Sequence, residues 1–332
     1  MGICPPLHRK DRTMTTTEAP RATARPATIA EIVGQTELVS RLRLVMAGSI
    51  RRGVKAPHVL LSGPAGHGKT SLAGVIAHEL GVEMTTTSGP ALRRVGDIAG
   101  LLCSLEDGAV LFIDEIHRLP TVVEEALYEA LEDGRLSMTA GVGAAARAIS
   151  LELPPFVLVG ATTKPGALSA PLRDRFGFHG TVAPYSVSEL ATIAGRAWMR
   201  AGVPFDPQAA TVLAERSKGV PRVALHLAER VMDVAALRRE PVSPSLVATA
   251  LTAFGIGADG LDEIDLRILG ALTTLFAGRA VGLDNLAQAL DLDAKTIEAE
   301  HEGALVRAGL VLRTASGRLA TPRAYDVVKA HR

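Results

Sequence analysis

A glycine-rich stretch, GPAGHGKTSL at 63–72, constrains the fold of this chain more than any other feature. It follows the apolar run VLLS and precedes the apolar run AGVIA. The glycines and Pro64 exclude a regular helix through the stretch, and Lys69 stands where a helix would begin. We therefore expect a tight turn between a buried strand and a helix.

The spacing from Gly63 to Thr70 matches a P-loop, in which backbone N–H groups surround phosphates. The helix that follows points its N-terminus at the anion. Lys69 would reach the β- and γ-phosphates of ATP, and the Thr70 hydroxyl would bind Mg²⁺. The other expected nucleotide contacts are Gly63, Gly66, Gly68 and Ser71. A glycine turn without a ligand is the alternative, and the strand and helix around the motif disfavour it.

Two acids follow the apolar run VLFI at 110–113. Asp114 would hold the Mg²⁺-bound water and so belong to the metal site, and Glu115 would polarise the attacking water. A solvated acidic strand end is the simpler interpretation of one acid alone. Beside a P-loop, the pair predicts hydrolysis of the bound nucleotide.

The segment 29–182 alternates short apolar strands with helical stretches, which is typical of an α/β domain with a parallel sheet. The expected strands are 58–63, 110–115 and 156–163. Between the last two, residues 136–151 alternate around Gly-Val-Gly and predict a β-hairpin. Residues 1–28, rich in Thr, Pro, Ala and Arg, are expected to be a disordered tail.

The pattern becomes helical at 183–255, which predicts a small lid domain of three helices. Ser186 or Ser188 would cap the first of them. After a Gly/Asp-rich linker at 255–263, the segment 256–332 contains three helical stretches and a hairpin with a basic turn. This order is typical of a DNA-binding winged helix.

Charge and composition limit the partners. The net charge is only +1, so nucleic acid would need a local basic patch, and residues 303–332 supply one with six Lys or Arg against one acid. No apolar run is long enough for a membrane span. The two cysteines, Cys4 and Cys103, lack metal-ligand spacing and suit a reducing compartment, so we expect a cytoplasmic protein.

Three arginines and three histidines need separate interpretations. Arg173 and Arg175 follow the third strand and fit an arginine finger for a neighbouring subunit, although surface arginines are usually only solvated. Arg222 opens a helix in the lid, where it would reach the γ-phosphate or simply start the helix. The histidines without metal-like partners are expected to be structural or exposed: His67, His117 and His301.

Five stretches in this order carry a family resemblance: IVGQ (32–35), GPAGHGKT, LFIDEIHRL (111–119), GATTKPGALSAPLRDRFG (160–177) and GVPR (219–222). VGLDNLA (281–287) and RTASGRLAT (313–321) follow in the winged helix. From about residue 25 onward, the chain resembles the RuvB family of AAA+ motors, which drive branch migration of Holliday junctions. The resemblance implies an ATP-hydrolysing, helicase-type ring, expected to be a hexamer, that acts in DNA recombination and repair.

The resemblance also implies roles for matching residues. Thr163 takes the position of the γ-phosphate sensor, Arg175 that of the finger, and Arg222 that of the lid sensor. Contacts on the adenine side are implied for Arg25, Ile32, Val33 and Tyr185, and DNA contacts for Arg313 and Arg318. The hairpin at 136–151 corresponds to the segment that docks the partner protein RuvA.

Some stretches depart from the family pattern and suggest a divergent copy. The wing turn reads Ala315-Ser316, without the usual basic residue, and the hairpin is rich in alanine, a poor interface anchor. Two other functions stay open: a clamp-loader-like or regulatory AAA+ switch without translocase activity, and a transcription regulator with a vestigial nucleotide site. The intact hydrolytic set disfavours the last.

Overall fold

The computed structural model describes residues 25–140 and 147–331 of the 332-residue chain. The predicted disordered tail lies outside the described residues up to residue 24, as does the tip of the predicted hairpin. In the described part, no helix combines the length and apolar character that a membrane span requires.

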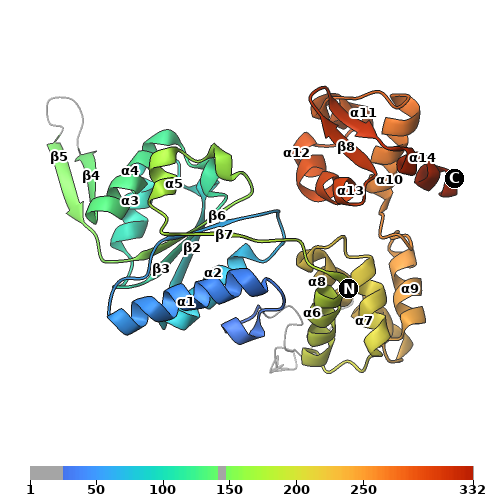
Figure 1. Ribbon diagram of the computed structural model, residues 1–332, viewed down its shortest axis with the longest axis horizontal. Helices are drawn as coiled ribbons and strands as arrows, with labels where there is room; N and C mark the ends of the chain where they lie inside the picture. Colours follow the sequence, from blue (N-terminus) through green and yellow to red (C-terminus); the bar gives the residue numbers. More distant parts are fainter. Residues whose placement is uncertain (1–24, 141–146, 332) are drawn as a thin grey trace, which may run out of the picture.

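A parallel sheet forms the centre of the first domain (Figure 1). Within the described residues it has five strands in the order β2-β3-β6-β1-β7. The predicted α/β class is confirmed, but the three predicted strands, now β1, β3 and β6, are only the central ones. The edge strands β2 and β7 were missed because they are half-exposed and carry Thr, His and Gly rather than an apolar run. The bounds are β1 (Val59–Ser62), β2 (Met84–Ser88), β3 (Val110–Asp114), β6 (Val157–Thr162) and β7 (Phe178–Thr181).

Helices cover both faces of this sheet (Figure 1). In β3, Leu111 and Ile113 join the core under α3, α4 and α5, whereas Val110 and Phe112 join the core under α1 and α2. This alternation buries every apolar residue of the strand and explains its continuous apolar run. The helices are α1 (Thr36–Arg52), α2 (Lys69–Leu80), α3 (Val95–Cys103), α4 (Thr121–Asp133) and α5 (Ala170–Asp174), with short 3₁₀ turns η1 (Ile29–Glu31), η2 (Gly89–Ala91), η3 (Ile116–Arg118) and η5 (Pro165–Ala167).

The predicted hairpin is present as the antiparallel strands β4 (Arg135–Ala140) and β5 (Arg147–Glu152). It projects from the domain beside α3 and α4 (Figure 1). Met138 and Leu151 pack against the core at its base, while Ile149 stays exposed.

The lid has a core of its own, built around Trp198, Leu213 and Val231. Ser186, rather than Ser188, is the N-cap, and it forms the predicted capping box with Glu189. The prediction of three helices was wrong by one, because short helices that begin at prolines merge in the sequence pattern. Within the described residues, the four helices are α6 (Val187–Arg200), α7 (Pro207–Glu215), α8 (Pro221–Arg238) and α9 (Pro244–Ala253).

The winged helix follows α9 through a thin linker (Figure 1). Its three predicted helical stretches and hairpin are present, but two stretches contain π-helical turns and a terminal helix, α14, was missed. The elements are α10 (Glu263–Gly270) with η6 (Ala271–Leu275), α11 (Leu283–Leu290), α12 (Ala294–Thr296) with η7 (Ile297–Glu302) and α13 (Gly303–Arg307), β8 (Val311–Thr314), β9 (Gly317–Ala320) and α14 (Pro322–Ala330).

Candidate functional site

The glycine-rich loop lies between β1 and α2, as predicted. Gly63, Gly66 and Gly68 have φ angles of 142°, 75° and 91°, in the region that side chains rarely adopt. Lys69 is the first residue of α2, and Thr70 and Ser71 follow in its first turn, both half-buried. The first N–H groups of a helix have no partner within it, so this turn presents donors to an anion.

The lid contacts the loop directly. A Cβ on Gly66 would lie 2.9 Å from Cγ1 of Val220 and 3.2 Å from Cβ of Arg222. The backbone N–H of Arg222 also donates to the Gly66 carbonyl over 3.3 Å. The structure thus brings Arg222, from the start of α8, to the P-loop, as its expected sensor role requires.

Lys69 is buried, with 7% of its surface exposed, and its ammonium turns back onto its own loop. Its Nζ donates to the carbonyls of Gly63 and Pro64, each at 2.9 Å. Burial lowers the pKa of Lys69, Arg222 lowers it further, and the nearby Asp114 and Glu115 oppose this. A phosphate would add the negative charge that a buried ammonium lacks, so the loop fits a nucleotide.

Asp114 and Glu115 lie at the carboxyl end of β3. Glu115 has φ 50°, a left-handed conformation that is uncommon for a residue with a side chain. Its N–H donates to Oδ1 of Asp114 over 2.9 Å, and its carboxylate pairs with Arg118 at 2.8 Å. Gly89 lies so close that a Cβ there would be 2.4 Å from the Glu115 carbonyl. The close approach of Gly89 and the hydrogen bond to Asp114 thus fix the backbone of the acid pair. The Asp114 carboxylate and the Thr70 hydroxyl offer oxygen ligands, which Mg²⁺ prefers.

The neighbouring strand β6 ends in two threonines with different surroundings. Thr162 is fully buried, and its Oγ1 lies 3.0 Å from Nδ1 of His117 and accepts from the N–H of Lys164. Thr163, the predicted sensor, comes directly after the strand and is exposed. The pairing of Thr162 with His117 was missed, since the two residues are 45 positions apart.

Arg175 contacts helix α4 of its own domain rather than the P-loop. Its guanidinium donates to the Tyr128 hydroxyl over 2.8 Å, pairs with Glu132 at 2.5 Å and stacks over the Tyr128 ring. Both partners belong to α4, and they raise the pKa of Arg175. Arg173 is half-buried at the end of α5. The structure therefore holds Arg175 in place on the large domain without placing it on the domain's own nucleotide loop.

Of the residues expected on the adenine side, Tyr185 lies beside the P-loop. Its ring is 3.3 Å from a Cβ built on Gly34, its hydroxyl is 3.6 Å from one built on Gly68, and burial raises its pKa. Gln35 joins the same region to the lid, exchanging two hydrogen bonds of 2.7 and 3.0 Å with the Ala183 backbone. The remaining predicted residues are less enclosed: Ile32 and Val33 are half-buried, and Arg25 is exposed.

His67 is buried within the loop, with 1% of its surface exposed, so it is not an exposed histidine. Its Nδ1 lies 2.8 Å from the Ala65 carbonyl and therefore carries the proton. Its Nε2 is buried with no hydrogen-bond partner among the described residues, and burial lowers its pKa. The P-loop thus encloses an imidazole nitrogen that has no hydrogen-bond partner within the described residues.

The wing arginines share a buried acid that sequence reasoning missed. Arg313 and Arg318 face each other across β8 and β9, and both contact Oε1 of Glu302, at 2.9 and 2.8 Å. Arg318 also reaches Oε2 at 3.1 Å. Glu302 is 2% exposed, against 54% for the Arg313 side chain and 20% for Arg318. One of the two positive charges expected to meet DNA is therefore neutralised within the domain.

Comparisons with known proteins agree along the chain. The model of the Holliday junction DNA helicase RuvB P-loop domain matches residues 24–182, that of the RuvB AAA lid domain matches 185–257, and that of the RuvB C-terminal winged helix domain matches 258–329.

Among solved structures, the Thermotoga maritima RuvB Holliday junction branch migration motor is 40% identical, with a TM-score of 0.84 over 92% of this chain and 98% of that chain. A single-residue variant of that RuvB has a TM-score of 0.86 over 92% of this chain and 99% of its own, at 40% identity. The Aeropyrum pernix ORC2 protein shares only the fold, with a TM-score of 0.57 at 16% identity over 94% of this chain and 97% of its own. The chain belongs to the RuvB family of AAA+ P-loop ATPases, the family of Holliday junction branch migration motors.

Proposed function

We propose that this protein is an ATP-dependent DNA motor that drives branch migration of Holliday junctions as a hexameric ring with a RuvA-type partner. One observation supports this proposal above the others: the lid helix α8 rests on the P-loop through Arg222 and Gly66. A nucleotide bound in the loop would lie against the lid, so hydrolysis would change what the lid contacts.

The chain's own residues have distinct roles in this proposal. Lys69 binds the β- and γ-phosphates, and it must leave the carbonyls of Gly63 and Pro64 to do so. Thr70 and Asp114 would hold Mg²⁺, which would offset the negative charge of the phosphates. Glu115 orients the attacking water once its carboxylate leaves Arg118.

Two further residues would respond to the γ-phosphate. Thr163 directly follows β6, and Arg222 lies at the start of α8. Arg175 would act on a neighbouring subunit's nucleotide as an arginine finger, which accounts for its attachment to α4 rather than to its own loop. A ring is required for this contact, because the finger and the loop it serves belong to different copies.

DNA would contact the wing through Arg313 and Arg318, which suit phosphate binding without reading sequence. The RuvA-type partner would dock on the hairpin at 136–151. Ile149, 42% exposed on β5, offers a large aliphatic side chain for such a contact.

The experiment is an ATPase assay on the full chain, with and without four-way-junction DNA, for the wild type, Lys69→Ala and Glu115→Gln. Glu125→Gln, an exposed acid on α4, is the matched control. We expect junction DNA to raise the wild-type and control rates, and both site variants to be inactive. Equal rates in all four proteins would refute the proposal.

A switch without translocation is the second candidate, favoured by one observation. Glu302 already pairs with both wing arginines, as it would if DNA binding were regulated rather than constant. This candidate predicts nucleotide-dependent DNA binding but no movement of a four-way junction.

A further inference from the structure

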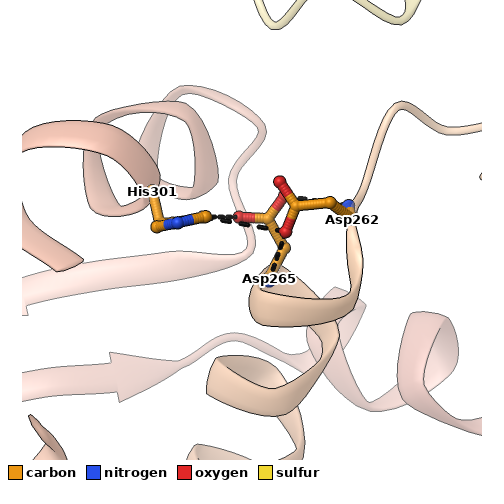
Figure 2. A group of neighbouring side chains, drawn as sticks. All are labelled: Asp262, Asp265 and His301. Atoms are coloured by element: carbon orange, nitrogen blue, oxygen red, sulfur yellow. Dashed lines mark hydrogen bonds and ion pairs between the residues drawn. The ribbon is translucent and has the colours of Figure 1, made fainter. Parts of the chain in front are cut away.

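Three side chains of the winged helix form a cluster in which Asp262 is only partly buried (Figure 2). Nδ1 of His301 lies 2.8 Å from Oδ1 of Asp265 and 3.8 Å from Oδ1 of Asp262. Asp265 is completely buried and His301 is 5% exposed. The carboxylate can only accept, so Nδ1 of His301 carries the proton. The three possible ligand atoms lie within 4.8 Å of one another, close enough for a metal ion.

A lysine from the lid fills the place that a metal ion would need. Nζ of Lys218 lies 2.6 Å from Oδ2 of Asp262 and also contacts Oδ2 of Asp265. Burial alone would raise the pKa of Asp265, but the hydrogen bond from His301 and the charge of Lys218 outweigh it and hold the pKa below its usual range. The Lys218 ammonium therefore pairs the carboxylates of the winged helix with a positive charge from the lid.

A second contact joins the same two domains at this point. The Arg307 guanidinium, at the end of α13, donates to the carbonyl of Lys218 over 3.0 Å. The winged helix therefore contacts both the side chain and the carbonyl of Lys218, whose backbone is left-handed, with φ 55°. If the lid moved away, the ion pairs of Lys218 with Asp262 and Asp265 would break, and Asp265 would lose the cation that offsets its burial. The winged helix must therefore follow this part of the lid.

On the other side of the cluster, the π-helical turn η7 links it to the wing. His301 and Glu302 are consecutive buried residues of η7; His301 contacts Asp265, and Glu302 holds Arg313 and Arg318. Glu298, in the same turn, reaches Lys164 at 3.3 Å, directly after Thr163 of the large domain. Inserted π-helical turns often occur at functional sites. Here η7 contacts Lys164 of the large domain, Asp265 of the cluster and the two arginines of the wing.

The lid segment that carries Lys218 also contacts the nucleotide loop. Lys218 precedes the segment Gly219–Arg222, and Val220 and Arg222 pack on Gly66. Only three residues therefore separate the lysine that contacts the winged helix from the arginine that lies on the P-loop.

We propose that Lys218, Asp265, His301 and Glu302 form an interdomain joint that couples the nucleotide state of the P-loop to the DNA affinity of the wing. The inference rests on the proposed function, because it takes DNA as the ligand of Arg313 and Arg318. Lys218 acts as a positioning residue, because its ammonium contacts Asp262 and Asp265 of the winged helix. A joint of this kind must work in both directions, because coupling between two binding sites is reciprocal.

The test measures that coupling in the full chain. The dissociation constant of a duplex DNA is measured by fluorescence anisotropy with ATPγS and with ADP, and that of each nucleotide with and without DNA. The Lys218→Met/Asp265→Asn double variant removes both charges together, so no lone charge stays buried. Lys295→Met, an exposed lysine in α12, is the control.

We expect the wild type and the control to change DNA affinity at least about fivefold between the two nucleotides, with the same factor in the reciprocal measurement. In the double variant the factor should fall to within about twofold of one, while the affinity for each nucleotide alone stays within about twofold of wild type. An unchanged factor in the double variant would overturn the inference, as would a wild type that binds DNA equally in both states. A wild type that does not bind DNA would refute the proposed function itself.

Two further variants and a metal titration also test the inference. If the double variant does not fold, Glu302→Gln changes the same joint at its wing end and should abolish the coupling. Lys218→Arg keeps the charge and should retain it. Titration with Co²⁺ tests the metal alternative: visible absorption that appears in the wild type and is lost in Asp265→Asn would show an ion at the cluster and overturn the joint.

Discussion

Glu302→Gln separates two effects that usually change together, the stability of the winged helix and its affinity for DNA. The carboxylate is 2% exposed and accepts hydrogen bonds from both Arg313 and Arg318. Glutamine keeps the shape of the side chain and one acceptor oxygen but removes the charge. The net charge of the three side chains therefore rises by one unit.

The cost in stability should be moderate. Removing one partner of a buried ion pair typically costs about 3–5 kcal/mol when the remaining charge stays buried. Here 54% of the Arg313 side chain and 20% of Arg318 reach water, so the two guanidiniums can regain hydration. We expect a loss of about 1–2 kcal/mol in the free energy of unfolding, measured by urea denaturation of the full chain.

DNA affinity should change in the opposite direction. One more free positive charge adds about one phosphate contact, which steepens the slope of log K against log salt by about 0.9. The variant should therefore bind duplex DNA more tightly at low salt, and this advantage should shrink about 3.5-fold between 50 and 200 mM salt. The assay is fluorescence anisotropy over a salt series.

Glu300→Gln is the matched control, because it makes the same change in net charge at an exposed position of η7. Its slope should move less than half as far as that of Glu302→Gln. Weaker binding by Glu302→Gln at every salt concentration, with an unchanged slope, would refute the reasoning. It would mean that Glu302 orients the arginines for DNA rather than neutralising them.

Three further predictions concern the large domain. Arg175→Ala should leave ATP binding intact and lower hydrolysis by the assembled protein by about 10³-fold or more; equal hydrolysis by isolated monomers and the assembly would contradict the finger role. Thr163→Val should lower ATP hydrolysis without changing stability. Thr162→Val leaves His117 and the Lys164 N–H without their partner and should lower the free energy of unfolding, measured by thermal unfolding, by about 1–3 kcal/mol. The reverse result would assign the sensor role to Thr162. Burial and the charge of Lys55 lower the pKa of His58 from 6.5 to about 3, so its neutral form stabilises the fold above pH 6.5 and this contribution is lost as the pH falls toward 3. Between pH 7 and 5 the loss should be about 2 kcal/mol and should be absent in His58→Gln; an equal loss in that variant would contradict it.

Much of the fold could be predicted because its central strands are buried on both faces. Val110 and Ile113 had to be apolar whichever side of the sheet they face, so β3 is visible in sequence as an unbroken run. The edge strand β2 (Met84–Ser88) has no such constraint and was missed. Helix α14 was missed for a similar reason, since Ala324 is its only fully buried residue.

The candidate site divides in the same way. Loop positions such as Gly66 and Lys69 could be predicted because the motif is local, and the chemistry of phosphate binding dictates its residues. Contacts between distant segments could not be predicted, because no residue near His301 in the sequence indicates Asp265, 36 positions away, or Lys218 of the lid. The neutralisation of the wing arginines by Glu302 likewise depends on the π-helical turn, which the sequence pattern did not predict.

The most direct test of the motor is branch migration of a synthetic four-way junction, with ATP and a RuvA-type protein present, by the wild type and by Glu115→Gln. The account predicts that the wild type separates the junction into its duplex products by strand exchange. Glu115→Gln should bind ATP and junction DNA yet yield no product. Equal product from both proteins, or a wild type that hydrolyses ATP without moving the junction, would contradict the central claim.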